Sequence, residues 1–525
     1  MDCTTATVTV TNCTFTGNSS ANGGVLRSAD LSEITVQNSI IAFSTQGCAV
    51  NSAGGLFVTL TCCNLYGNHG GDWVAGAAGQ YGSNGNISLD PLFCNPESGD
   101  FHVREDSPCA PFSPPNPGCD LIGALPVGCP ASSPTTFVIA PDGTGDFPTI
   151  QAAIDAADHG DVIQLADGTF SGEGNRDLDY RGKIITVRSE SGNPEACIID
   201  CEGSEQNLRR GVYFALGLWE AAVLQGVTIT NGYEGDLGGA IIFDRSSPTV
   251  SNCVFFANHG ARGGALHCTT ASPTVRECVF RDNVAVEEGG AIYCDDLSFP
   301  VMIGCMLEGN TASIHGGGMY CSGSSPTVTD CVFHDNSADN GGGMSSKDYS
   351  CPTISNCTFT ENSAQQGNGG GLYLANGSDA AVEHSSFVAN ESLLGVGAGI
   401  YCQDSGPTVE YTAFLDNLAP QGAAVGCQSA TASFTNCTLC WNRASQGAGV
   451  WCDGSQITVE NTIIAFSPFG DAIHCTGGYS AMVTCSDIYG NAGGDWVGCI
   501  DWLEGVFGNI SEDPHFCGEL NPLLP

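Results

Sequence analysis

The sequence predicts an all-β protein, a right-handed parallel β-helix with about 26 residues in each three-strand coil. Two observations predict it. A closing Asn or Ser returns at a nearly constant interval, and ten such steps from Asn231 to Asn491 span 260 residues. Between them lie short segments in which small and apolar residues alternate, separated by turn residues. Repeats of this size bury one continuous core by stacking.

The closing residue is expected to stand in one corner of every coil. We expect this Asn to adopt the left-handed backbone and its amide to bond its counterparts in the coils above and below. The recurring motif FxxN, as in Phe333 to Asn336, places a ring inside the coil just before the corner. The structural ladder therefore consists of Asn231, Asn258, Asn283, Asn310, Asn336, Asn362, Asn390, Asn417, Asn442 and Asn491, with Ser467 in the remaining coil.

The Gly-rich segment GGAIYC, residues 289–294, has strand periodicity. Ile292 and Cys294 lie on one face, which we assign to the core, and Tyr293 lies on the other. Cysteines repeat in two inward slots. Buried free thiols, disulfides and metal sites are three interpretations of them, and the parallel side-chain directions in such ladders favour free thiols. The slots hold Cys253, Cys278, Cys305, Cys331 and Cys357, and Cys268, Cys294, Cys321, Cys402, Cys427 and Cys452.

Cysteines outside these ladders are the better disulfide candidates. They include three in a Pro-rich segment and two in an early coil, namely Cys109, Cys119, Cys129, Cys197 and Cys201.

A short helix is expected to cover the open end of the repeats. In residues 137–170 the apolar positions Ile150, Ala153, Ile154 and Ala157 follow helical spacing, with Thr149 as the N-cap and Gly160 as the stop signal. Such a capping helix is needed because the first coil would otherwise expose its core.

The chain divides into two β-helices. Residues 38–74 and 461–497 are similar to each other, which indicates that the start of the chain duplicates the end of the second helix. We assign 1–130 to the last coils and the Pro- and Cys-rich cap of a first β-helix, 131–136 to a linker, and 137–525 to a second β-helix with its N-terminal cap at 137–170 and a truncated C-terminal cap. We interpret the chain as part of a longer tandem array.

The motifs GGAI at 238 and 289, GGAL at 263 and the FxxN segments resemble the repeats of chlamydial polymorphic outer membrane proteins over roughly residues 225–495. The resemblance implies a surface β-helix of the pectin-lyase-like class with a role in adhesion. The segment DGTGDFPTIQAAIDAA, residues 142–157, is similar to the opening of pectin methylesterases, which is architectural and carries no catalytic group.

Composition restricts the partners. The net charge is −42, which disfavours nucleic acid and anionic membranes, and we expect no membrane insertion. The 29 cysteines indicate an oxidising compartment, so we place the chain outside the cell or on its surface, although residues 1–20 lack the features of a signal peptide. The expected partners are an extracellular glycan or a surface protein, and the open ends of a β-helix can also associate end to end.

One strip of side chains is the candidate ligand face. The outward slot of the Gly-rich strand holds His267, Tyr293, Tyr320, Tyr373, Tyr401 and Trp451. Rings one coil apart can cover one another, or they can present a surface to a glycan. Asp335 and Glu361 fall in register beside the Asn corner, as solvated charge or as weak calcium ligands. No other cofactor is expected.

The sequence brings no catalytic residues together: Asp295 and Asp296 are adjacent and face apart. We therefore expect a rigid, non-catalytic adhesin or structural spacer that binds glycans. The alternative is a polysaccharide lyase or glycoside hydrolase of the same fold.

Overall fold

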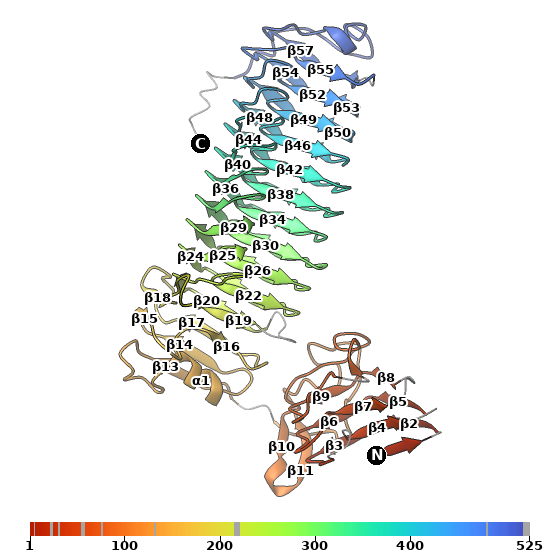
Figure 1. Cartoon of the computed structure of the whole chain (residues 1–525), viewed down its shortest axis with the longest axis vertical. Helices are drawn as coiled ribbons and strands as arrows, with labels where there is room; N and C mark the ends of the chain where they lie inside the picture. The colour runs from red at the N-terminus through yellow and green to blue at the C-terminus, as the bar shows by residue number, and fades with distance from the viewer. Residues whose placement is uncertain are drawn as a thin grey trace.

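The computed structural model describes most of the chain (Figure 1). The described residues are 1–4, 6–20, 25–29, 32–53, 58–74, 77–130, 133–214, 221–478 and 481–517. Strands before and after the linker share no sheet, so the protein contains two stacks of coils. We call residues 1–130 the first stack and residues 137–517 the second stack. Among the described residues no helix is long and apolar enough to cross a membrane.

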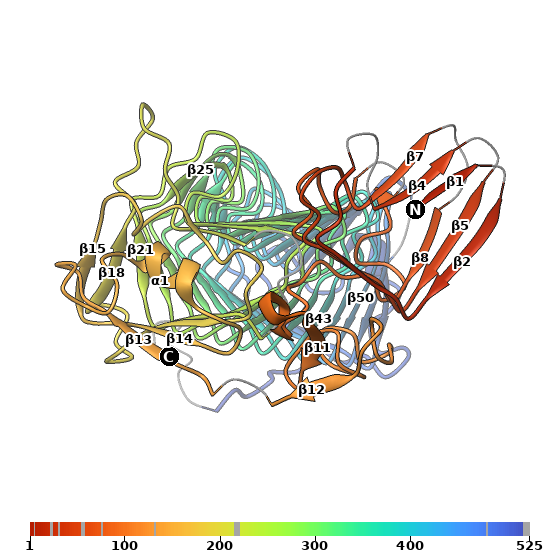
Figure 2. The same cartoon turned by 90° about the horizontal axis from the view of Figure 1, so that it is seen from below.

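The second stack is built from three long parallel sheets (Figures 1 and 2). Sheet I has 14 strands from β13 (Thr136–Ile139) to β56 (Ala481–Thr484), and sheet II has 13 strands from β15 (Gly168–Phe170) to β57 (Asp487–Tyr489). Sheet III has 12 strands, which are β16 (Leu178–Asp179), β19 (Val212–Phe214), β22 (Ile241–Asp244), β26 (Leu266–Thr269), β30 (Ile292–Asp295), β34 (Met319–Ser322), β38 (Met344–Lys347), β42 (Leu372–Ala375), β46 (Ile400–Gln403), β49 (Val425–Gln428), β52 (Val450–Asp453) and β55 (Ile473–Thr476).

The central coils carry a fourth strand that the three-strand repeat did not anticipate. It lies between the strands of sheets II and III and forms a six-stranded parallel sheet, sheet IV. Its strands are β25 (His259–Arg262), β29 (Val284–Glu288), β33 (Thr311–Ala312), β37 (Ser337–Ala338), β41 (Ser363–Ala364) and β45 (Glu391–Ser392). The predicted all-β parallel helix is confirmed.

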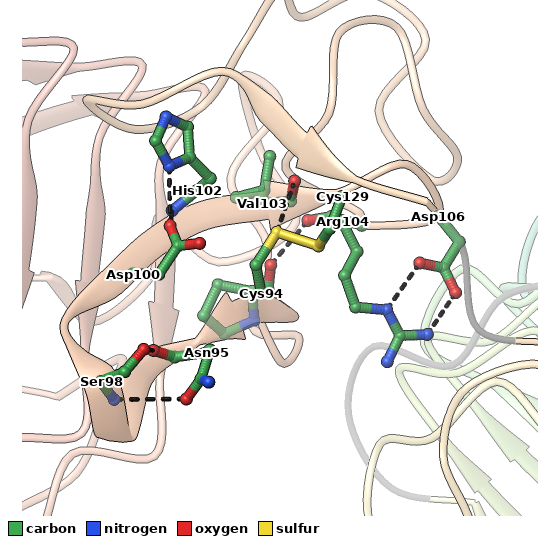
Figure 3. The surroundings of a disulfide bond; sticks show 11 residues. Cys94, Asn95, Ser98, Asp100, His102, Val103, Arg104, Asp106 and Cys129 are labelled. Carbon is green, nitrogen blue, oxygen red and sulfur yellow. Dashed lines mark hydrogen bonds and ion pairs between the residues drawn. A yellow bond between two sulfur atoms is a disulfide. The ribbon is translucent and has the colours of Figure 1, made fainter.

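The first stack has three short parallel sheets, closed by an irregular cap. In the cap, β10 (Phe93–Asn95) and β11 (Asp100–Arg104) pair antiparallel, and β12 (Val127–Cys129) joins β11. A disulfide ties Cys94 to Cys129, close to the ion pair between Arg104 and Asp106 (Figure 3). The stacked strands are β1 (Asp2–Thr4), β4 (Leu26–Ala29) and β7 (Val50–Ala53); β2 (Thr7–Thr11), β5 (Glu33–Gln37) and β8 (Val58–Thr61); and β3 (Thr14–Thr16), β6 (Ile40–Ala42) and β9 (Asn64–Tyr66).

The expected capping helix is α1 (Ile150–Ala156). The Thr149 side chain accepts a hydrogen bond from the backbone N–H of Ala152 at 3.3 Å, so Thr149 is the N-cap. Ile150, Ala153 and Ile154 are fully buried against the first coil. The apolar spacing read from the sequence is therefore the face that covers the core.

The interior is layered by residue type. Ile292 and Cys294 lie in the core as expected, and the FxxN rings stack on one another along the axis. Phe333 and Phe359 have ring centroids 4.5 Å apart, and Phe359 and Phe387 have centroids 4.7 Å apart. Such a column buries large apolar area in every coil.

The Asn ladder is continuous from Asn258 to Asn442. Each amide nitrogen donates to the amide oxygen one coil further on, for example from Asn310 to Asn336 at 2.9 Å and from Asn336 to Asn362 at 3.0 Å. The members of this run are Asn258, Asn283, Asn310, Asn336, Asn362, Asn390, Asn417 and Asn442.

Two expectations about the ladder need correction. Asn231 is exposed, and the backbone N–H of Gly232 bonds the Asn258 amide instead, so the repeat reaches its slot one residue later. The left-handed backbone belongs to the residue before the Asn, as at Asp335 (φ 50°) and Glu361 (φ 56°). Asp and Gly, which tolerate that conformation, stand there in several coils, but Glu361, Ala389 and Trp441 adopt it as well. Asn491 occupies the expected slot one coil beyond Ser467. Its amide oxygen accepts the Ser467 backbone N–H at 3.1 Å, and its amide nitrogen donates to Asp495 at 2.8 Å.

The ladder cysteines are free and buried, in agreement with the thiol interpretation. Three disulfides join Cys62 to Cys119, Cys94 to Cys129 and Cys475 to Cys499. Cys119 and Cys129 are therefore paired as expected. Cys109, Cys197 and Cys201 are buried and free, which corrects that part of the prediction.

We expect thiol counting to return 23 free cysteines of 29 after denaturation without reductant, and 29 with it. In the native protein most of them should react slowly, because burial blocks access and raises the pKa of thiols such as Cys437 to about 11. Only the exposed Cys351, Cys485 and Cys517 should react quickly. A denatured count close to one free thiol would contradict this account of the ladders.

Candidate functional site

The candidate ligand strip lies on sheet III, where the second residue of successive strands points away from the core. The ring centroids of His267 and Tyr293 are 4.9 Å apart, and those of Tyr293 and Tyr320 are 5.4 Å apart. Tyr373 and Tyr401 stack in the same way at 5.6 Å. Neighbouring rings of His267 and the tyrosines cover one another, and the six residues are only 2% to 9% exposed. We call this set the aromatic strip.

The strip continues across the coil in which Ser345 replaces the ring. His315, which comes from the turn before β34, inserts between Tyr320 and Tyr373, with centroids 5.7 Å from each. At Gly426 there is likewise no ring, and Val396 packs against Tyr373 and Tyr401. Side chains from a neighbouring row therefore fill the gaps in the strip.

That neighbouring row precedes the Gly turn of each coil. Its members pair in register along the axis, and each stands immediately before a glycine with positive φ, such as Gly289 (φ 68°). A Cβ on Gly289 would lie 2.3 Å from the carbonyl oxygen of Ile292, so only glycine permits the reversal. The reversal brings the row against the strip. We call this set the preceding row: Arg262, Glu288, His315, Asn340, Asn368, Val396, Gln421 and Gln446.

A second row lies on the other side of the strip, at the last residue of each sheet III strand. We call it the following row, and over the same coils it consists of Thr269, Asp295, Ser322, Lys347, Ala375, Gln403, Gln428 and Asp453. Across these eight coils, all within the described part of the chain, one coil alone has a carboxylate in both rows. That coil carries Glu288 before its glycine and Asp295 after its tyrosine.

Both carboxylates are half-buried beside Tyr293. Burial raises the pKa of Glu288, the cations Arg262 and Lys347 and a hydrogen bond with Tyr320 oppose that rise, and the neighbouring Glu287 adds to it. Burial also raises the pKa of Asp295, where a hydrogen bond from Thr269 and the charge of Arg262 oppose the rise and the neighbouring Asp296 adds to it. After burial, the charges of Asp295 and Glu288 are the next two influences that raise the pKa of the Tyr293 phenol. Two perturbed carboxyl groups therefore flank one ring of the strip.

Asp295 is held in place by a chain of hydrogen bonds. The Thr269 hydroxyl donates to an Asp295 carboxylate oxygen at 2.9 Å, and a His267 ring nitrogen lies 2.9 Å from the same hydroxyl. His267 is 2% exposed, and burial lowers its pKa to about 4. The imidazole is therefore neutral at pH 7 and orients the threonine without adding charge.

We expect this histidine to make stability depend on pH. An unfolded histidine has a pKa of about 6.5, so the unfolded state binds a proton that the folded state excludes until the pH nears 4. The contribution is fully present above about pH 6.5 and falls by about 3 kcal/mol by pH 4. Urea midpoints for the parent and His267→Gln at neutral and acid pH test this, with the exposed His515→Gln as control. Equal acid losses in the parent and His267→Gln would contradict it.

Lys347 reaches over the strip from the following row. Its ammonium lies 3.3 Å from a ring nitrogen of His315 in the preceding row. Burial, and then the Lys347 charge, lower the pKa of His315 to about 4. The other His315 ring nitrogen, Nδ1, is buried without a hydrogen-bond partner. The neutral His315 ring is therefore the neighbour of Glu288 in the next coil, and the Lys347 ammonium lies beside that ring.

The sequence-predicted site residues outside the Asn ladder fall into two groups. The aromatic strip is one surface, and its role in ligand binding stays a prediction. Asp335 and Glu361 are exposed on a corner away from it, and the described residues contain no group of three or more His, Cys, Asp or Glu side chains placed to hold a metal, so the calcium role also stays a prediction. Glu288 was missed. The signal for it was the sole repeat with acidic residues on both sides of GGAIYC.

The family described as "Right handed beta helix region" matches residues 179–325 and 305–464. No curated protein matches the chain significantly. Three solved structures are similar at low TM-scores. The catalytic unit of a GH87 α-1,3-glucanase from Streptomyces thermodiastaticus has a TM-score of 0.40 and 13% identity, covering 70% of this chain and 71% of that one. The mannuronan C-5 epimerase AlgE6 A-module of Azotobacter vinelandii has a TM-score of 0.30 and 14% identity, covering 70% and 95%. An alginate lyase from Paenibacillus has a TM-score of 0.27 and 12% identity, covering 66% and 99%.

Proposed function

The chain belongs to the right-handed β-helix family, and from this premise we propose that it is an extracellular enzyme that hydrolyses a neutral polysaccharide. The observation that carries the proposal is the coil with carboxylates on both sides of the aromatic strip, Glu288 and Asp295. Glycoside hydrolysis uses two carboxyl groups that flank the scissile bond, one of them protonated. This replaces the sequence-based preference for a non-catalytic protein with its alternative.

The surroundings of each carboxyl group indicate which one acts as the general acid and which one is ionised. Asp295 is the general acid, because burial and the adjacent Asp296 favour its protonated form. It gives its proton to the glycosidic oxygen as the bond to the leaving sugar breaks. We assign Glu288 as the ionised partner, because Lys347 and a hydrogen bond with Tyr320 favour its negative charge, whereas Arg262 acts on both carboxyl groups. It faces the same sugar carbon as base or nucleophile, and water completes the hydrolysis.

A neutral substrate agrees with the charges. The net charge of −42 repels polyuronates, and the two catalytic carboxyl groups add local negative charge. Beyond them the rows are rich in amides, including Asn340, Asn368, Gln403 and Gln428. Amides donate to and accept from sugar hydroxyl groups without requiring a charged partner. The stacked tyrosines offer further hydroxyl groups.

A second candidate is a non-catalytic glycan-binding spacer. The observation that favours it is the length of the strip, which extends from His267 to Trp451 with amide-rich rows and a single carboxylate pair. In this case the same surface would bind a polysaccharide along the axis without cleaving it.

A panel of neutral glycans and polyuronates separates these functions. New reducing ends from a neutral glycan support hydrolysis. Unsaturated ends from a polyuronate would instead indicate a lyase, and retention of a glycan with no new ends would indicate the spacer. The proposed hydrolase is contradicted by either of the last two results.

A further inference from the structure

We propose that the N-terminal coils of the second stack contain a separate site that binds a sugar carrying one oxyanion group, either a carboxylate or a sulfate. A cavity of about 430 Å³ is lined by residues of α1 and the first coils, whereas the carboxylate pair stands at β30, which is four strands beyond β16 in sheet III. The cavity is lined by Gln151, Glu173, Gly174, Arg176, Asp177, Arg181 and Arg209. Three arginines line it in a protein with only 14 basic residues.

The surrounding segment holds a large share of the basic residues of the chain. Six of the 14 Lys and Arg residues fall between 176 and 210, and they are Arg176, Arg181, Lys183, Arg188, Arg209 and Arg210. Seven Asp and Glu residues lie in the same segment, so the attraction for a single anionic group depends on the placement of arginines around the cavity and not on a net positive charge. A polyanion would still be repelled by the rest of the surface.

The three arginines of the cavity differ in how fully they are paired. Arg176 bonds the backbone carbonyl of Cys201 at 2.9 Å and also the carboxylate of Glu202. Arg181 pairs with Asp179 at 3.0 Å. Arg209 has only a distant pairing with Asp177 at 3.5 Å, and its Nε atom is buried without a hydrogen-bond partner. The Nε–H of Arg209, whose side chain is otherwise 41% exposed, is therefore the buried donor of these arginines that lacks an acceptor.

An oxyanion would satisfy that donor. A buried guanidinium N–H without an acceptor costs stability, and a carboxylate or sulfate oxygen accepts from two donors of the planar fork at once. The carboxylates of Glu173 and Asp177, which also line the cavity, would then meet the remainder of the ligand, whereas the Gln151 amide is already bonded to Asp179 and Asp155. Carboxylates accept hydrogen bonds from hydroxyl groups, so the lining fits a hydroxylated ring that bears one anionic group better than an inorganic ion.

The test is calorimetric titration of the full chain with sodium glucuronate, glucose 6-sulfate and glucose. We expect one or both acidic sugars to bind and glucose not to bind. Arg209→Gln should weaken the acidic sugar about 10-fold or more, whereas Arg188→Gln, outside the cavity, should leave binding unchanged. The two acidic arms distinguish the carboxylate from the sulfate.

Arg181→Gln provides a second variant, because its side chain is 57% exposed and its replacement should not disturb folding. It should also weaken the acidic sugar, and added salt should weaken binding to the parent. Equal binding of glucose, failure of both acidic sugars to bind, or unchanged binding in Arg209→Gln and Arg181→Gln would overturn the proposal. None of these results depends on hydrolytic activity.

Discussion

Glu288→Gln and Asp295→Asn are each expected to lower kcat/KM on the hydrolysed glycan by about 1,000-fold while leaving the fold intact. Each substitution keeps the size of the side chain and removes the ability to ionise. Asn at 295 still accepts the Thr269 hydroxyl that is 2.9 Å away in the parent, so the hydrogen-bond chain to His267 persists. Reducing-end assays at several substrate concentrations measure the effect.

Asp453→Asn is the matched control. Asp453 occupies the same row as Asp295 and accepts the Thr476 hydroxyl at 2.7 Å, but its coil has Gln446 where Glu288 stands. We therefore expect Asp453→Asn to retain nearly full activity. Equal losses in Asp295→Asn and Asp453→Asn would show that the row binds the glycan without performing acid catalysis.

The pH profile gives a further sign of the two roles. Because burial raises the pKa of Asp295, its proton is kept to a higher pH than in an ordinary aspartate, and activity should fall as the pH rises through that value. On the acid side, activity should fall as Glu288 becomes protonated, so the profile should be bell-shaped.

Asn336→Ala is expected to lower the free energy of unfolding by about 4 kcal/mol. The substitution removes the acceptor for the backbone and amide N–H groups of Asn310, both 0% exposed. It also removes the donor to the Leu307 carbonyl and to Asn362. A buried polar group left without a partner lowers the free energy of unfolding by more than a typical hydrogen bond contributes to it.

Hydrogen exchange of the coils around residues 307–362, together with urea denaturation, measures this loss. The exposed Asn193→Ala is the control and should change stability by less than about 1 kcal/mol. A loss in Asn336→Ala no larger than that of the control would contradict the role of the ladder.

Much of the fold could be predicted because every coil of a solenoid repeats the same local interactions. The 26-residue period, the inward Phe of FxxN and the Thr149 cap each reflect a local rule, and the structure confirms them. The error at Asn231 arose because an Asn stands one residue before the true slot, where Gly232 supplies only a backbone N–H. The spacing between closing residues already varies by more than one residue from coil to coil, so counting the spacing cannot reveal a shift of one residue.

The carboxylate pair could not be derived from strand alternation. Glu288 and Asp295 are seven residues apart, and a regular strand of that length would hold them far from each other. The left-handed Gly289 reverses the chain between Glu288 and β30, so that the charges of both Glu288 and Asp295 act on Tyr293. The fourth strand of the central coils, which ends at Glu288 in β29, was also hidden, because short strands between turns leave little periodic signal.

The most direct test of the proposed hydrolysis is mass spectrometry of the products that the protein releases from a neutral glycan in heavy-oxygen water. Hydrolysis consumes one water for each bond cleaved, so we expect the heavy oxygen at the new reducing end. The label should appear with the parent and with Asp453→Asn, and the Glu288→Gln, Asp295→Asn double variant should release almost no product. Unlabelled unsaturated products, or labelled products from the double variant at the parent's rate, would contradict the account.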